Sequence, residues 1–136
     1  MMFAIKTAIA DASAEAFQFP AQKSMYGGKH VAAGDEIFVI ASENGGGAGL
    51  IARGVVTRAE ATPRTPGIER QTPRVGIAVR RTAIARRRLG RGELVPFSDW
   101  SDGRPETELN FKLYRQATDK IVGISDGAAA FLRGFF

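Results

Sequence analysis

The chain contains no cysteine and a single histidine, His30, among its 136 residues. The absence of cysteine excludes thiol catalysis, disulfide bonds and cysteine-based zinc or iron–sulfur sites. One histidine also excludes metal sites built from several histidines. No apolar run approaches the roughly 20 residues that span a bilayer, and the N-terminus lacks the basic region and apolar run of a secretory signal. We therefore expect a cytoplasmic protein with no membrane segment, metal or cofactor.

Positive charge is concentrated in one segment of a chain whose formal net charge is +5. Residues 64–104 contain ten arginines against four acidic residues, whereas the remainder holds nine lysines or arginines against ten acidic residues. The planar guanidinium of arginine is suited to phosphate groups and to stacking on bases. Such a segment indicates binding to a polyanion, either DNA or RNA. The alternative is a solvated surface that keeps the protein soluble.

The hydrophobic pattern predicts one domain, residues 1–136, with five or six strands and short helices near both ends. This order favours an α+β fold with a small, curved antiparallel sheet or barrel, because strands and helices do not alternate as a parallel sheet requires. The ends of the chain are expected to form a helix over 12–17, stopped by Pro20, and a final helix capped by Ser125. Strands are expected at 3–8, 36–42, 50–59, 74–81 and 108–116, an apolar segment at 118–124, and one or two helical turns at 82–90.

Three N-terminal stretches resemble a known superfamily: FAIKTA (3–8), MYGGKHVAAGDEIFVIAS (25–42) and AGLIARGVVTRAEA (48–61). In this order and spacing they are similar to the EVE and YTH branches of the PUA-like superfamily, over about the first 60 residues. The family's first strand ends in Lys-Ser, where this chain has Lys6-Thr7. The typical tryptophan of the second stretch is missing, and Tyr26 lies near its place.

The resemblance implies a PUA-like barrel whose cleft takes a nucleotide, often a modified base held by aromatic rings. Tyr26 lies in a glycine-flanked loop and Trp100 in a polar loop, so both are candidates for stacking on a base. For each ring, the alternative is packing against the core or the sheet. Tyr114 is a further candidate for a ring that faces the groove. The residues that we expect around the base are Lys6, Thr7, Tyr26, Lys29, His30, Ser42 and Trp100.

The arginines that follow the 62–73 loop are the candidates for contacts with the phosphate backbone. A strand end followed by a basic segment directs several guanidinium groups the same way. Contacts of this kind give strong salt dependence and little sequence preference. The residues are Arg74, Arg80, Arg81, Arg86, Arg87, Arg88 and Arg91.

No combination of residues in the sequence indicates catalysis. The carboxylate pairs Asp35–Glu36 and Glu106/Glu108 could bind a metal but are more simply explained as solvated, and the glycine run 45–49 lacks a phosphate-loop signature. We therefore predict a non-enzymatic module that binds nucleic acid and accommodates a single base. One alternative is a small hydrolase of RNA or nucleotides that uses His30 or the carboxylates. The other is a protein-interaction module whose basic segment binds an acidic partner. An effector protein such as a nuclease is a candidate partner, and the oligomeric state stays open.

Overall fold

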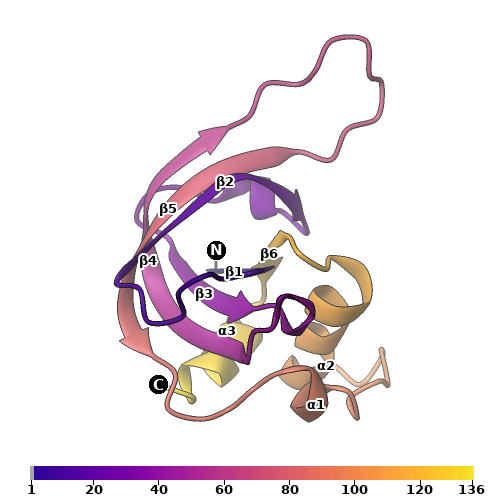
Figure 1. The fold of residues 1–136 in the computed structure, drawn as a ribbon. Helices are drawn as coiled ribbons and strands as arrows, with labels where there is room; N and C mark the ends of the chain where they lie inside the picture. Colours follow the sequence, from indigo (N-terminus) through magenta and orange to yellow (C-terminus); the bar gives the residue numbers. More distant parts are fainter. Residues whose placement is uncertain (1) are drawn as a thin grey trace.

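Six strands close into a barrel in the order β1-β3-β4-β5-β2-β6 in the computed structural model, which describes residues 2–136 (Figure 1). Four of the six pairings are antiparallel, whereas β1–β3 and β2–β6 are parallel. The expected small barrel is therefore confirmed, with mixed rather than purely antiparallel pairing. The strands are β1 (Met2–Thr7), β2 (Ala16–Met25), β3 (Glu36–Ala41), β4 (Gly49–Ala61), β5 (Arg74–Ile84) and β6 (Ile121–Ile124).

The helices follow β5 and cover one side of the barrel, where their labels lie together in Figure 1. They are α1 (Arg91–Leu94), α2 (Pro105–Asn110), its π-helical continuation η3 (Phe111–Gln116), and α3 (Asp126–Arg133). Two single 3₁₀ turns, η1 (Gly28–His30) and η2 (Glu43–Gly45), join the strands. None of these helices is both long and apolar enough to cross a membrane in the part of the chain that the structure describes.

Strand β1 is buried on both faces because side chains alternate along a strand. Phe3 and Ile5 pack inside the barrel, whereas Ala4 packs in a second apolar cluster with the helices. Strand β3 divides its residues in the same way, with Ile37 inside and Phe38 under the helices. This arrangement places the side chain of every second residue of β1 and β3 between the barrel wall and the helices.

The expected helix over 12–17 is wrong, and no helix forms near the N-terminus in residues 2–27. Strand β2 begins at Ala16 and places Phe17 and Phe19 in the barrel interior, where their rings stack 5.7 Å apart. Pro20 lies where the register with β5 shifts, between Phe19 and Gln22. Since proline is tolerated in strands at bulges, it interrupts pairing here without ending the strand. Burial of two phenylalanines outweighs the local preference of the alanine-rich stretch for a helix.

The expected strand over 108–116 is a helix, formed by α2 and η3. Leu109, Leu113 and Ala117 are buried at a spacing of four residues, which is the spacing of one helix face. Pro105 is the first residue of α2, where its fixed φ suits a helix start. The alternation of Leu109, Phe111 and Leu113 is compatible with both structures, and packing against the barrel wall selects the helix.

The expected helical turns over 82–90 are also wrong, because β5 continues to Ile84 as the partner of β4. The antiparallel pairing of β3 with β4 confirms the expected hairpin. The final helix is confirmed as well: the Ser125 hydroxyl accepts a hydrogen bond of 3.1 Å from the backbone N–H of Ala128.

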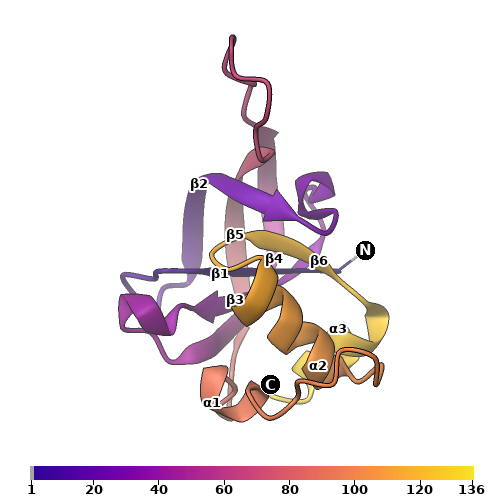
Figure 2. The ribbon, with the colours of Figure 1, turned by 90° about the vertical axis from the view of Figure 1, so that its right-hand side faces the viewer.

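The β4–β5 ribbon extends beyond the barrel and ends in the 62–73 loop, which stands apart from the rest of the molecule in Figures 1 and 2. The side chain of Gln71 bonds to the backbone of Thr65 at both N–H and carbonyl, and to the carbonyl of Ile68. Arg64 donates to the carbonyl of Glu69 at 2.7 Å. These bonds give the loop a defined shape without regular secondary structure.

Candidate functional site

A basic cleft lies between the 62–73 loop and the end of β2 with η1. Its volume is about 680 Å³. Its lining includes no acidic residue, although Glu69 belongs to the same loop. In Figure 2 the loop rises from the end of the barrel that carries the end of β2 and the small coil of η1. The basic residues that line the cleft are Lys23, Lys29, His30, Arg64, Arg70 and Arg74.

Hydrogen bonds to the backbone fix both walls of this cleft. The hydroxyl and the N–H of Ser24 both donate to the carbonyl of Pro73, at 2.9 and 3.0 Å, so the loop is attached to β2. Arg74 donates to the carbonyl of Ala21 at 3.1 Å. By contrast, four basic side chains have no hydrogen bond or ion pair with any other residue within 2–136, and their donors are available to a ligand: Lys23, Lys29, His30 and Arg70.

Tyr26 lies between Lys23 and Lys29 of this cleft in the sequence, and 40% of its surface is exposed. Its φ of 53° is a left-handed conformation, which is uncommon for a residue other than glycine. The ammonium of Lys112 lies 5.0 Å from the centre of the Tyr26 ring, within the range of a cation–π interaction. The ring is therefore held at the surface, three residues before the Lys29 of the cleft.

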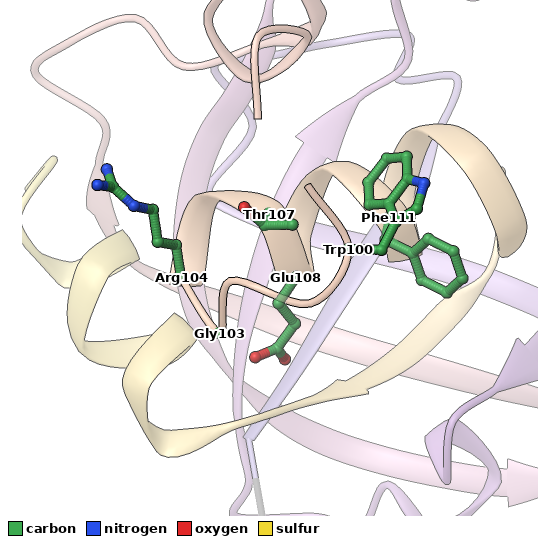
Figure 3. A pocket seen from close by; sticks show the side chains of 6 residues that line it. All are labelled: Trp100, Gly103, Arg104, Thr107, Glu108 and Phe111. Atoms are coloured by element: carbon green, nitrogen blue, oxygen red, sulfur yellow. The ribbon is translucent and has the colours of Figure 1, made fainter. Parts of the chain in front are cut away.

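Trp100 lines a second, smaller recess of about 270 Å³ on α2 and η3 (Figure 3). Its ring packs against Phe111 with the two centroids 5.2 Å apart, and the guanidinium of Arg115 lies 5.5 Å from the indole. Figure 3 shows the two rings side by side at one end of the recess and Arg104 at the other. Trp100 stays 44% exposed, so part of its ring is free to stack.

Lys6 lies inside the molecule and not at the mouth of a pocket, since only 1% of it is exposed. It is on the face of β1 that the helices cover. Its ammonium donates to the carbonyl of Leu113 at 2.9 Å and lies 4.2 Å from the centre of the Tyr114 ring. Burial lowers the pKa of the Lys6 amine. The expectation that Lys6 presents its charge to a ligand at the rim is therefore wrong.

Thr7 and Ser42 join the ends of β1 and β3 through their backbones. The N–H of Ser42 donates to the carbonyl of Thr7 at 2.8 Å, and the Ser42 side chain is buried. Neither residue lies in the basic cleft or in the Trp100 recess. A contact of either residue with a base stays a prediction.

Tyr114 connects η3 to the tip of the β3–β4 hairpin. Its hydroxyl donates to the carboxylate of Glu43, at 3.0 and 3.1 Å to the two oxygens, and Glu43 also accepts from the N–H of Arg91 at 2.6 Å. Burial, followed by the Glu43 charge, raises the pKa of the Tyr114 phenol well above its usual value. Tyr114, which we expected to face the groove, thus bonds the glycine-rich hairpin tip to η3 through its hydroxyl.

The arginines after Arg74 do not join it in the cleft. Several bond to the protein's own backbone: Arg81 to the carbonyls of Ser13 and Ala14, Arg86 to that of Phe136, and Arg87 to that of Gly134. The other three form no bond to a backbone carbonyl and are exposed, as Arg86 and Arg87 also are: Arg80, which lies outward on β5, Arg88, which lies 3.5 Å from Glu93, and Arg91, whose guanidinium bonds to Asn44. Residues 86–91 lie near the C-terminus, at the other end of the barrel from the loop (Figure 1).

Three of the four carboxylates in the two pairs bond within the protein, whereas the Glu106 side chain forms no hydrogen bond or ion pair in residues 2–136. Glu36 forms ion pairs with Arg53 and Arg133, at 2.6 and 2.8 Å, and Asp35 accepts from the N–H of Ala32. Glu108 accepts from Lys112 and from Ser125. No group of three or more histidine or acidic residues within 2–136 is arranged to hold a metal ion.

Sequence reasoning found Lys29, His30 and Arg74 of the cleft and missed Lys23, Arg64 and Arg70. The available signal was the loop sequence TPRTPGIERQTP, in which two arginines lie between two predicted strands. A prediction that the two flanking strands form a long ribbon would have placed both arginines on the same wall of the cleft.

No protein-family model matches the sequence, and no curated protein matches it. Solved structures do match over nearly the whole chain. The DUF55 domain of human thymocyte nuclear protein 1 superposes with a TM-score of 0.66 at 14% identity, covering 98% of this chain and 97% of that one. The chain has the fold of the DUF55 domain. This is the PUA-like, EVE-type barrel that the N-terminal resemblance predicts, so that prediction is confirmed for the fold.

Two further structures share the DUF55 fold. Human THYN1 protein in complex with DNA that contains 5-methylcytosine has a TM-score of 0.65 at 13% identity, covering 98% of this chain and 95% of that one. A protein from Pseudomonas syringae has a TM-score of 0.63 at 15% identity and full coverage of both chains. At these identities the likeness concerns the fold.

Proposed function

We propose that this chain is a non-enzymatic module that binds nucleic acid, with the phosphate backbone in the basic cleft. The observation that carries the proposal is the collection of five lysines and arginines and one histidine on two facing walls without an acidic residue between them. Lysine and arginine donors on phosphate oxygens give affinity and orientation. Human THYN1 protein, which has the same fold, was solved in complex with DNA that contains 5-methylcytosine, and this supports nucleic acid as the ligand class.

A single base, methylated or not, would stack on Tyr26 or in the Trp100 recess. Both rings are partly exposed and each has a cation beside it. A recess of about 270 Å³ lies just below the usual size of pockets for drug-like ligands, which begins near 300 Å³. This size suits one base better than a larger ligand.

The protein-interaction alternative rests on the same basic cleft. It predicts that the protein does not distinguish nucleic acid from other polyanions such as heparin. The hydrolase alternative predicts turnover that depends on a metal or on pH. The bonds made by Glu36 and Glu108 within the protein favour binding over hydrolysis as the function.

The test is fluorescence anisotropy with single-stranded and duplex oligonucleotides of DNA and RNA, at several salt concentrations. The variant is Lys29→Gln/Arg70→Gln, which removes two charges from the cleft. The control is Arg80→Gln/Arg88→Gln, which removes the same charge from exposed positions outside the cleft.

We expect the cleft variant to weaken binding to all sequences about equally and to reduce the slope of log K against log salt by about 1 for each charge that contacts phosphate. The control variant should keep the wild-type slope. Equal effects of the two variants, or equal binding of heparin and oligonucleotides by the wild type, would contradict the proposal.

A further inference from the structure

The last residues of strand β5 form an open edge of the barrel. Strand β2 pairs with β5 only as far as Arg80, and the N–H of Arg81 adds a bond of 2.9 Å to the carbonyl of Glu15. Strand β4, on the other side, pairs with β5 as far as Ile84. Residues 82–84 therefore have a neighbouring strand on one side only within the described chain, and their free side can pair with a further strand.

This edge is exposed and carries an apolar side chain. Thr82 and Ile84 lie on the outward face of β5, and Ile84 is 52% exposed. The hydroxyl of Thr82 donates to the carbonyl of Arg53 on the neighbouring strand β4, at 3.3 Å, and so leaves the free side open. Figure 1 shows this end of β5 at the opposite end of the strand from the 62–73 loop, roughly 30 Å away along the strand. The edge is therefore separate from the basic cleft.

Arginines flank this edge on both sides along the chain. Arg80 precedes it, is exposed and forms no ion pair within residues 2–136. Arg86 and Arg87 follow it, and each uses one guanidinium nitrogen for a backbone carbonyl, which leaves further N–H donors free. The side chain of Arg88 is 63% exposed, although Glu93 lies 3.5 Å from it. These residues together form the β5 edge surface: residues 82–84, Arg80, Arg86, Arg87 and Arg88.

Charge and backbone geometry together decide which partner fits the β5 edge surface. A second copy paired through the same edge would bring the two sets of arginines together, which repulsion between like charges opposes. A nucleic acid offers phosphates to the arginines but has no amide groups that could pair with the strand edge. An extended peptide has these amide groups, its acidic side chains attract the arginines, and an apolar side chain covers Ile84.

We propose that the β5 edge surface binds an extended acidic segment of another protein, which adds to the barrel as a strand beside residues 82–84. Main-chain hydrogen bonds along the edge give affinity, and alternate side chains of the segment give specificity. Side chains on one face of a strand recur at every second residue. An apolar residue opposite Ile84 thus has acidic residues two positions away on either side, directed toward the flanking arginines. The inference does not depend on the proposed function, since the surface lies outside the basic cleft.

The test is fluorescence anisotropy with a labelled peptide of the sequence Glu-Thr-Glu-Thr-Val-Thr-Glu-Thr-Glu. One comparison peptide has proline in place of the two central threonines, which keeps the charge and prevents strand pairing. The other has lysine in place of every glutamate. The variants of the surface are Arg80→Gln/Arg88→Gln and Ile84→Ala. Their matched controls are Lys29→Gln/Arg70→Gln, which removes the same charge from the cleft, and Ile68→Ala, since Ile68 is also 52% exposed but lies on the 62–73 loop.

We expect the wild type to bind the acidic peptide more tightly than the other two peptides. Loss of two exposed ion pairs in Arg80→Gln/Arg88→Gln should weaken this binding about three- to tenfold. Ile84→Ala should weaken it by roughly the same factor, because less apolar surface is buried. Both control variants should bind the peptide like the wild type. In hydrogen exchange, the backbone amides of residues 82–84 should be protected when the peptide is bound.

Equal binding of the acidic peptide and its proline counterpart would show attraction of charge without strand pairing and would overturn the inference. Displacement of the bound peptide by an oligonucleotide would assign the surface to nucleic acid. Self-association of the protein that Ile84→Ala abolishes would assign it to a second copy. Either of these results would also overturn the inference, whereas the test of the basic cleft with Lys29→Gln/Arg70→Gln and oligonucleotides would stand by itself.

Discussion

The ammonium of Lys6 lies 2.9 Å from the carbonyl oxygen of Leu113, so the first strand is bonded directly to the π-helical turn η3. The bond joins residues 107 positions apart and is buried. Tyr114 covers the same ammonium with its ring, at 4.2 Å from the centroid. Lys6 therefore connects barrel and helices, which is a structural role.

Replacement of Lys6 by Met tests this role, because the substitution keeps the apolar stem and removes the ammonium. We expect a loss of about 1–3 kcal/mol in the free energy of unfolding, since the Leu113 carbonyl loses a buried donor. Urea denaturation measures the loss. Affinity for oligonucleotides should be the same as in the wild type at a temperature where both proteins are folded. A stable Lys6→Met protein with weakened binding would instead return Lys6 to the base site.

One of the two exposed rings, Tyr26 or Trp100, is expected to stack on the bound base. Removal of a stacked ring weakens binding by about 1–3 kcal/mol per base, or roughly 5- to 150-fold. We expect this loss of affinity in Tyr26→Ala or in Trp100→Ala. The same variant should lose any preference for 5-methylcytosine or N6-methyladenine in single strands. Anisotropy measures both quantities. Tyr26→Phe and Trp100→Phe keep a ring and should retain binding, and wild-type behaviour of both alanine variants would exclude an aromatic base site.

Glu108 is expected to make stability depend on pH. Burial opposes its charge, but hydrogen bonds from Ser125 and the charge of Lys112 keep its pKa below the usual 4.5 in the folded protein. The unfolded chain then binds a proton first as the pH falls. The stabilisation by Glu108 is thus complete above pH 4.5 and is lost as the pH falls from there through the lower folded pKa.

Glu108→Gln should lower the free energy of unfolding by about 1.5–3 kcal/mol at pH 7, the range for a hydrogen bond to a charged group. The difference from the wild type should shrink at pH 3, which urea denaturation at the two pH values measures. Glu106→Gln is the control, because the Glu106 side chain forms no ion pair in residues 2–136. An equal loss at both pH values would contradict the assignment.

Local patterns predicted those elements in which one residue type determines the outcome. The alternation of Val75, Ile77 and Val79 identified β5, and the hydroxyl of Ser125 identified the start of α3. The predictions of a helix over 12–17 and a strand over 108–116 were wrong, because each of these sequence patterns is compatible with both a helix and a strand. Packing decided between them: Phe17 and Phe19 fill the barrel, and Leu109 and Leu113 cover its wall.

The candidate site was predicted only in part, again because contacts distant in sequence decide the outcome. Charge counting located the arginines, but many guanidinium groups can bond to carbonyls of their own chain. Arg86 and Arg87 do so at the C-terminus, whereas Arg70 has no such partner within the described residues. The spacing of arginines along the chain contains no information about this difference.

The sequence by itself determined that this protein lacks thiol and multi-histidine chemistry, that its excess positive charge lies within 64–104, and that its strands form a small curved sheet. These properties follow from composition and from the two-residue period of a strand. Only the tertiary structure decided that Lys6 is buried and that Lys23, Lys29, Arg64 and Arg70 face one cleft. The period of a strand fixes which side chains share a face. Which face another element covers depends on contacts between residues that are distant in sequence.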